Sequence, residues 1–144
     1  MHYEGTVEVK KSIKEVFDFL IDPRKISTVI PDLENLEVID ENNFNIKAKV
    51  GISFIKGSMS LKFKIEEKKE PKHAKISGNG TGMQSSVNMN LSFDLEEKEN
   101  GTLIKWFADV QIGGLLASVG SRLIDNAAQR YIQNVVDGIK SKLS

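Results

Sequence analysis

Three charged residues near the C-terminus are the side chains of this sequence best placed to act together. Arg122 and Asp125 are three positions apart in a segment of helical periodicity, and Asp109 lies in the strand-like stretch before it. Side chains three apart on a helix can reach each other, so these groups can form ion pairs. We favour a structural interpretation, in which they link the last strand to the helix. In the alternative, Arg122 or Tyr131 binds the polar end of a ligand.

The other residues that could carry chemistry give weaker signals. His2 and His73 are the only histidines, and neither has a second ligand at helical or hairpin spacing, so we expect no metal site. The absence of cysteine excludes disulfides and thiolate chemistry. Residues 77–82 have the glycine spacing of a phosphate-binding loop, but strand alternation resumes at Val87, where such a loop needs a helix. We interpret these glycines as cavity-forming positions or a bulged strand edge.

Length and charge narrow the functional classes further. The 144 residues suffice for a single domain, 1–144, with a substantial core. The 20 basic and 20 acidic residues balance, so no overall field favours nucleic acid. No apolar run approaches the ~20 residues that cross a bilayer, and the N-terminus lacks a secretion signal. We predict a cytoplasmic protein, peripheral to the membrane at most, that needs no cofactor.

Alternation along the chain predicts the elements that position these side chains. Apolar and polar residues alternate with the period of half-buried strands around residues 3–9, 36–38, 44–50, 55–65, 74–80, 87–95 and 104–112. Two short helices are expected between the first two strands, and the segment 114–144 has an apolar stripe at helical spacing. We predict an α+β fold in which one long C-terminal helix covers a curved, seven-stranded antiparallel sheet.

The apolar stripe of this final helix is thin at its centre. Gly120, Ala127 and Ala128 face a sheet that also has glycines at inward positions. Because protein interiors leave few voids, this shortage of side-chain volume predicts an apolar ligand cavity on the order of several hundred Å³. Its predicted lining is Met59, Leu61, Phe63, Ile76, Met89, Leu91, Phe93, Trp106, Ala108, Leu116, Val119, Leu123, Ala127 and Tyr131. A closed core made of the same side chains is the alternative.

Apolar side chains also occur where turns are expected. We predict that they surround one end of the cavity: Ile30, Pro31, Leu33, Ile52, Phe54, Met83 and Leu115. Exposed apolar clusters usually mark a ligand mouth or a docking surface. These residues therefore either contact a membrane or protein partner, or fold inward as a lid.

The chain resembles the helix-grip superfamily, which includes the birch pollen allergen, START lipid-transfer domains and polyketide cyclase-like proteins. Within it, the chain most resembles the family of the G subunit of carbon monoxide dehydrogenase. The resemblance rests on Glu4-Gly5, Phe17 to Pro23, Ile30-Pro31-Asp32 and, most specifically, Ala108 to Gly114 running into Gly120 to Asp125. It implies a helix-grip fold with an apolar-ligand cavity. Resemblance to this narrower family also implies a role beside a molybdenum-containing dehydrogenase, helping it reach the membrane or its lipophilic quinone acceptor.

Two functions follow from this interpretation. The inward strand positions include no His, Asp or Glu, whereas general acid–base catalysis needs a titratable group beside the substrate. We therefore predict non-enzymatic binding or carriage of a small lipophilic molecule, such as a quinone or lipid, with a dehydrogenase as partner and transient membrane contact. The alternative is a polyketide cyclase- or hydrolase-like enzyme with an apolar substrate. The chain lacks the C-terminal membrane tail of some family members, so we expect a soluble carrier.

Overall fold

The computed structural model describes all 144 residues as one sheet with helices on one side. The N-terminal part contains β1 (His2–Val9), α1 (Ile13–Ile21), α2 (Pro23–Ile26) and the 3-10 segment η1 (Ser27–Val29). The remaining strands are β2 (Leu33–Val38), β3 (Asn43–Ile52), β4 (Ile55–Lys69), β5 (His73–Gly82), β6 (Ser85–Lys98) and β7 (Gly101–Gly114). The chain ends with the 3-10 segment η2 (Leu115–Val119) and α3 (Ser121–Lys142).

Capping residues set the starts of the two short helices. The Ser12 hydroxyl accepts a hydrogen bond from the Glu15 backbone N–H at 3.3 Å and also donates to the Glu15 carboxylate, so Ser12 caps the start of α1. The Asp22 carboxylate accepts from the Arg24 N–H at 2.9 Å, and Pro23 occupies the first turn of α2. Both helices therefore lie where the sequence predicts them.

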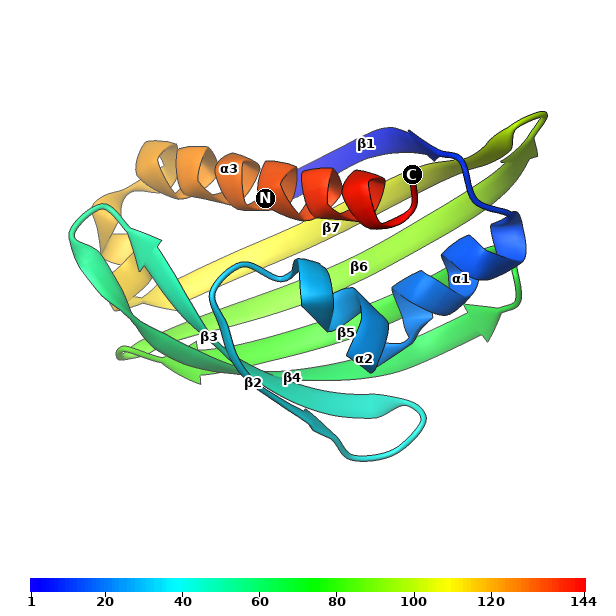
Figure 1. Cartoon of the computed structure of the whole chain (residues 1–144). Coiled ribbons are helices and arrows are strands. Elements are labelled where there is room, and N and C mark those ends of the chain that lie inside the picture. The colour runs from blue at the N-terminus through cyan, green and yellow to red at the C-terminus, as the bar shows by residue number, and fades with distance from the viewer.

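The sheet is antiparallel throughout, in the order β1-β7-β6-β5-β4-β3-β2. The first strand pairs with the last, from His2 opposite Asp109 to Val9 opposite Thr102. Figure 1 shows the sheet curving below α3, with α1 and α2 over the other part of the same face. The predicted α+β arrangement, with seven strands and a long C-terminal helix over the sheet, is confirmed.

The start of the long helix differs from the prediction. α3 begins at Ser121 rather than Gly114, and residues 115–119 form η2. Gly114 and Gly120 have φ angles of 79° and 96°, which a right-handed helix does not allow. The Leu116 N–H donates to the Ser85 hydroxyl at 2.9 Å, so this segment is also tied to the start of β6. The two glycines therefore separate what the apolar spacing alone presents as one helix.

Most of the buried apolar residues form two clusters rather than one continuous core. The α1 cluster joins α1 to β1 and to the ends of β6 and β7, and consists of Val7, Val9, Ile13, Val16, Phe17, Ala74, Phe93, Leu95, Ile104 and Leu143. The η2 cluster lies at the other end of the sheet and consists of Phe44, Ile46, Ile52, Ile55, Met59, Leu61, Leu116 and Ile124. Each end of the layered structure is thus closed by its own packed group of side chains.

Candidate functional site

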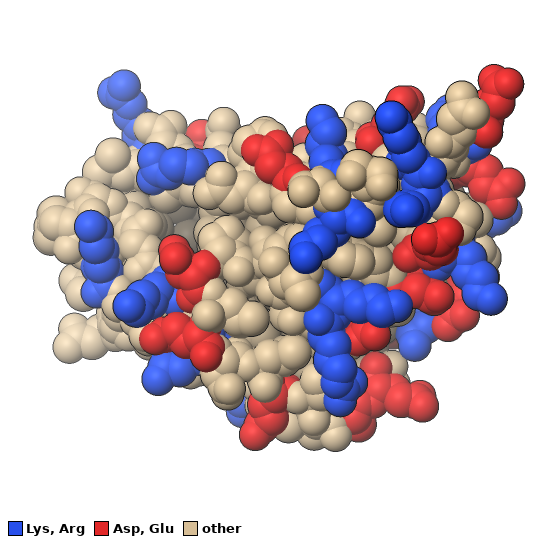
Figure 2. Space-filling view, in the orientation of Figure 1, with Lys and Arg blue, Asp and Glu red and all other residues tan.

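The face of α3 that lies toward the sheet is incompletely packed. Ile124 is the only buried residue among the 22 residues of this helix. A helix packed closely on a sheet buries a whole stripe of side chains. In the space-filling view, the surface is hollowed below the N-terminal half of α3 (Figure 2). The helix therefore lies over the sheet without burying the stripe beneath it.

The sheet opposite α3 shows the same incomplete packing. Phe63 on β4, Ile76 on β5, and Met89 and Leu91 on β6 are only half-buried, although they point to the same side of the sheet as the buried Leu61. Leu91 belongs to neither cluster, not even as a partly buried neighbour. Side chains on an inner face that keep accessible surface line a gap rather than a filled core. This gap lies between the α1 cluster and the η2 cluster.

The predicted lining residues fall into three groups. Met59, Leu61, Phe93, Ala108 and Leu116 are buried, whereas Phe63, Ile76, Met89, Leu91, Trp106, Val119 and Ala127 are half-buried. Leu123 and Tyr131 are 43% and 37% exposed. The expectation that Leu123 faces the interior is not supported, because Ile124 takes the buried position in that turn of α3. The half-buried group is the part of the predicted lining that best fits a ligand site.

The inward glycines make room for neighbouring side chains, which corrects the expectation that they form empty space. A Cβ atom added to Gly78 would lie 2.7 Å from Cε1 of Phe63, and one added to Gly57 would lie 2.6 Å from Sδ of Met83. Residues 77–82 belong to β5, an interior strand with continuous pairing to β6, so the bulged-edge interpretation is also wrong. The incomplete packing therefore comes from the small residues of α3 and not from these glycines.

Tyr3, rather than the predicted Arg122, links the sheet to α3. The Tyr3 hydroxyl on β1 donates to Oδ1 of Asp125 at 2.8 Å, and Gln129 donates to the other carboxylate oxygen at 2.9 Å. Burial, followed by the hydrogen bond to Asp125, raises the pKa of Tyr3 to about 12. Arg122 is exposed and forms no ion pair, while Asp109 bonds to His2 at 2.7 Å. The predicted pairing of Arg122 with either aspartate is wrong. From the sequence, Tyr3 could be recognised only as an inward-facing position of the first strand, and not as the partner of Asp125.

Tyr131 lies in the middle of α3, near the segment that carries Asp32. Burial raises the pKa of Tyr131 to about 12, and the nearby carboxylate of Asp32, between η1 and β2, adds to the rise. The side chain is nevertheless 37% exposed. The side chain of Tyr131 is thus only partly enclosed by protein.

Trp106, on the inner face of β7, contributes a second polar group. Its indole Nε1 is the only buried side-chain nitrogen or oxygen in the protein without a hydrogen-bond partner. The sequence pattern predicts Trp106 only as part of the apolar lining. Because the alternation of β7 already points this residue inward, its N–H was a donor that could have been recognised from the sequence.

Most of the predicted mouth residues fold inward. Ile52 is buried, and Ile30, Pro31, Leu33 and Met83 are half-buried. Phe54 and Leu115 differ from them, with 86% and 42% of their surface exposed. Phe54 is in the β3–β4 turn and Leu115 in η2, and both segments lie at the left end of Figure 1. The lid interpretation thus fits most of the group, and only these two residues form an outward apolar surface.

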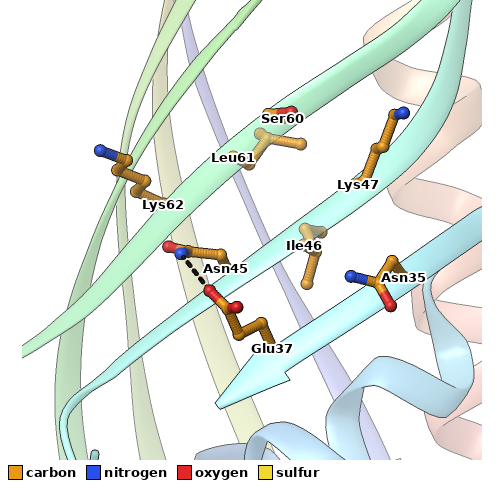
Figure 3. A pocket seen from close by; sticks show the side chains of 8 residues that line it. All are labelled: Asn35, Glu37, Asn45, Ile46, Lys47, Ser60, Leu61 and Lys62. Atoms are coloured by element: carbon orange, nitrogen blue, oxygen red, sulfur yellow. Dashed lines mark hydrogen bonds between the residues drawn. The ribbon is translucent and has the colours of Figure 1, made fainter. Parts of the chain in front are cut away.

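Two further pockets lie away from the predicted site. One, of about 230 Å³, is on the outer face of β2, β3 and β4 and has mainly polar walls, with Asn45 donating to Glu37 at 3.1 Å (Figure 3). The other, of about 690 Å³, is an open depression between the α1–α2 corner and the β2–β3 turn, with Arg24, Asp40 and Lys68 in its wall. Of the predicted lining residues, only Leu61 borders one of these pockets.

No group of three or more His, Cys, Asp or Glu side chains is arranged to hold a metal ion. None of the helices combines the length and apolar character needed to cross a bilayer. The polar groups around the gap are instead single hydrogen-bonding side chains.

Comparisons with known proteins agree with this architecture. The sequence profile of the family of the carbon monoxide dehydrogenase G subunit, CoxG, matches residues 5–144. A conserved protein from Geobacillus kaustophilus is similar over 99% of this chain and 95% of its own, with 26% identity and a TM-score of 0.90. A comparison with curated protein sequences finds no match.

More distant structures share the fold alone. A START superfamily protein from Mycobacterium smegmatis has 12% identity and a TM-score of 0.73, covering 99% of this chain and 96% of its own. An aromatase/cyclase from a Streptomyces species has 11% identity and a TM-score of 0.67, covering 99% and 93%. These likenesses confirm the helix-grip fold that the sequence resemblance implied.

Proposed function

This chain belongs to the CoxG family, that of the carbon monoxide dehydrogenase G subunit, and we propose that it binds a small lipophilic molecule between α3 and the curved sheet. One observation carries the proposal: the half-buried apolar side chains on the inner face of the sheet, between two closed clusters, with only Ile124 buried on the helix above them. Burying such surface against an apolar guest is favourable by roughly 25 cal/mol per Å². The protein thus offers a guest an interior surface that its own side chains leave uncovered.

The half-buried residues give this site its character. Phe63, Met89 and Leu91 supply apolar contact, and methionine adapts to guests of different shape. Tyr131 supplies a hydroxyl, which is neutral at physiological pH as in any tyrosine, and burial and the nearby Asp32 raise its pKa further, to about 12. A guest with an apolar body and one small polar end matches this distribution.

Carriage fits these residues better than catalysis. A general acid or base must hold a proton within reach of the substrate. Asp125 on α3 is the carboxylate that β1 contacts. Tyr3 and Gln129 each donate a hydrogen bond to one of its two oxygens, so neither oxygen is free to act as a base. A cyclase-like reaction is the second candidate, and its only support is the fold shared with the Streptomyces aromatase/cyclase. The name of the family supports an accessory role beside a carbon monoxide dehydrogenase. A quinone or a lipid is the cargo that we propose for this role.

The test fills the proposed site and measures binding of N-phenyl-1-naphthylamine, a neutral apolar fluorophore. Ala127→Phe adds a ring to the half-buried face of α3, and Asn126→Phe adds the same ring to the adjacent exposed position. We expect wild type and Asn126→Phe to bind alike and Ala127→Phe to bind about tenfold more weakly or not at all. Native mass spectrometry of the purified protein reads out any retained lipophile. Equal binding by both variants, or no binding by wild type, would contradict the proposal.

A further inference from the structure

β1 is an edge strand, and one side of its backbone has no partner in this chain. It pairs only with β7, and it borders the sheet beside α3 (Figure 1). The backbone nitrogens of Met1 and Val110 each donate to the other residue's carbonyl oxygen at 2.8 Å. In an antiparallel pair, residues bonded in this way alternate with residues whose N–H and C=O point away from the partner strand. The residues with backbone groups on the open side are therefore His2, Glu4, Thr6 and Glu8.

Little protects this open side of β1. None of the backbone hydrogen bonds outside the helices and strands involves these four residues, and all four are exposed. Only beyond them does the chain close the edge, where the Lys10 N–H donates to the carbonyl oxygen of Leu143 at 3.2 Å. β1 has no proline or bulge, whereas β2, at the other edge, is shorter and shifts register between Leu33 and Asn35. Short or bulged edges resist pairing with another chain, so β1 is the edge that can accept a further strand.

We propose that β1 pairs antiparallel with β1 of a second copy of this chain, with Gly5 on the two-fold axis, so that two sheets continue into one. His2 then lies opposite Glu8 of the second copy, and Glu4 lies opposite its Thr6. A slide of two residues would place Glu4 opposite Glu4 or Glu8, and carboxylates directly opposite each other are destabilising. A slide of one residue would place inward side chains opposite outward ones. The charges of β1 thus select one register, and this pairing does not depend on a guest between α3 and the sheet.

The side chains that meet in this register are complementary. On the inner face Met1, which is 42% exposed, comes opposite Val9 of the second copy. On the outer face, the hydrogen bond to Asp109 above all raises the pKa of His2, so its imidazole keeps a positive charge to higher pH. The carboxylate of Glu8 from the second copy comes opposite this imidazole. Such a self-complementary surface is what a two-fold dimer requires.

Cysteine pairs test the register, because the chain has no cysteine of its own. In His2→Cys/Glu8→Cys, each thiol would lie opposite one of the second copy, with Cα atoms about 5.5 Å apart, which a disulfide can bridge. Within one chain the two positions are about 20 Å apart. We expect mild oxidation to give a covalent dimer on a non-reducing gel. The control Glu4→Cys/Glu8→Cys puts thiols on the same face but only diagonally across, about 7–8 Å apart, and should give little covalent dimer.

Sedimentation equilibrium tests the dimer without added thiols, and we expect wild type to show twice the mass of one chain. The Thr6 N–H lies on the open side, so Thr6→Pro keeps the pairing with β7 and removes a donor to the second copy. We expect Thr6→Pro to dimerise at least about tenfold more weakly and Thr6→Val to dimerise like wild type. Wild type that sediments as a monomer at every concentration would overturn the proposal, as would equal dimerisation of Thr6→Pro. Equal cross-linking of the two cysteine variants would exclude this register.

Discussion

Gly5 on β1 and Trp106 on β7 face each other in register, and the indole occupies the place where a side chain of residue 5 would be. The hypothetical Cβ of Gly5 is 2.7 Å from Cζ2 and 2.9 Å from Cε2 of the ring, which is closer than real Cβ contacts come. The ring is rigid and is backed by Phe93 on β6. The indole can therefore take this orientation only because Gly5, on the edge strand β1, has no side chain.

Gly5→Ala should destabilise the protein by about 1–3 kcal/mol, because the added methyl group displaces the ring and overpacks this part of the core. Urea unfolding, followed by the fluorescence of Trp106, measures the change. Gly51→Ala is the matched control: its Cβ would lie 3.1 Å from Cγ of Lys56, a flexible surface side chain that can move. Similar stability losses for the two variants would contradict this explanation of Gly5.

Tyr3→Phe should cost about 0.5–1.5 kcal/mol, because it removes the hydrogen bond that joins β1 to Asp125 on α3. Arg122→Ala should change the free energy of unfolding by less than about 0.5 kcal/mol, since Arg122 is exposed and has no ion pair. Thermal and urea unfolding of both variants check the pair of expectations. A loss from Arg122→Ala as large as that from Tyr3→Phe would restore the interpretation that the arginine is the link.

Thr102→Val should destabilise the protein by about 1–3 kcal/mol. The Thr102 side chain is 1% exposed, and its hydroxyl donates to the Lys11 carbonyl oxygen at 2.8 Å, which fixes the start of β7 to the segment after β1. Thr28→Val removes a hydroxyl that donates to the Lys25 carbonyl oxygen at 2.7 Å in an exposed position. This control should change stability much less, because water replaces the lost partner. Equal effects on urea unfolding would show that burial of Thr102 is not the cause.

The two tyrosines should ionise late on raising the pH. Folding raises the pKa of both Tyr3 and Tyr131 from 10.0 to about 12, so between these values the unfolded chain loses protons that the folded protein keeps. The resulting stability is complete below pH 10 and is lost as the pH rises from 10 to about 12. Ultraviolet absorbance of tyrosinate should show a midpoint near 12 in buffer and near 10 in urea. The variant Tyr131→Phe should lose about half of the tyrosinate absorbance, which assigns the signal to the two tyrosines. A midpoint near 10 for both tyrosines in the folded protein would contradict this expectation.

The fold could be predicted from the sequence because the pattern that indicates each strand and helix lies within that segment of the chain. Alternation marks each strand, and Ser12 and Pro23 mark the starts of the short helices. Once seven strands and one long amphipathic segment are recognised, few packings bury both apolar faces. The break at Gly120 was missed because an apolar stripe continues across it, and spacing alone does not reveal a positive φ angle.

The candidate site could be predicted only in part, because it depends on contacts between distant strands. Alternation correctly placed Phe63, Met89 and Leu91 on the inner face. It could not show that the space beside Gly78 is filled by Phe63 from the next strand. The pairing register of neighbouring strands decides which side chain lies beside each glycine, and this register depends on the hydrophobic pattern of the whole sheet.

The pairing of the first strand with the last also affects how the protein forms during synthesis. His2 and Asp109, 107 positions apart, lie side by side, and the Lys10 N–H donates to the carbonyl oxygen of Leu143 at 3.2 Å. On a ribosome β1 emerges before its partner strand β7, and Lys10 emerges before Leu143. Contacts between such distant parts of a chain form slowly. The apolar face of β1 must therefore stay uncovered until β7 has been made, a period in which a chaperone or a neighbouring nascent chain can reach it.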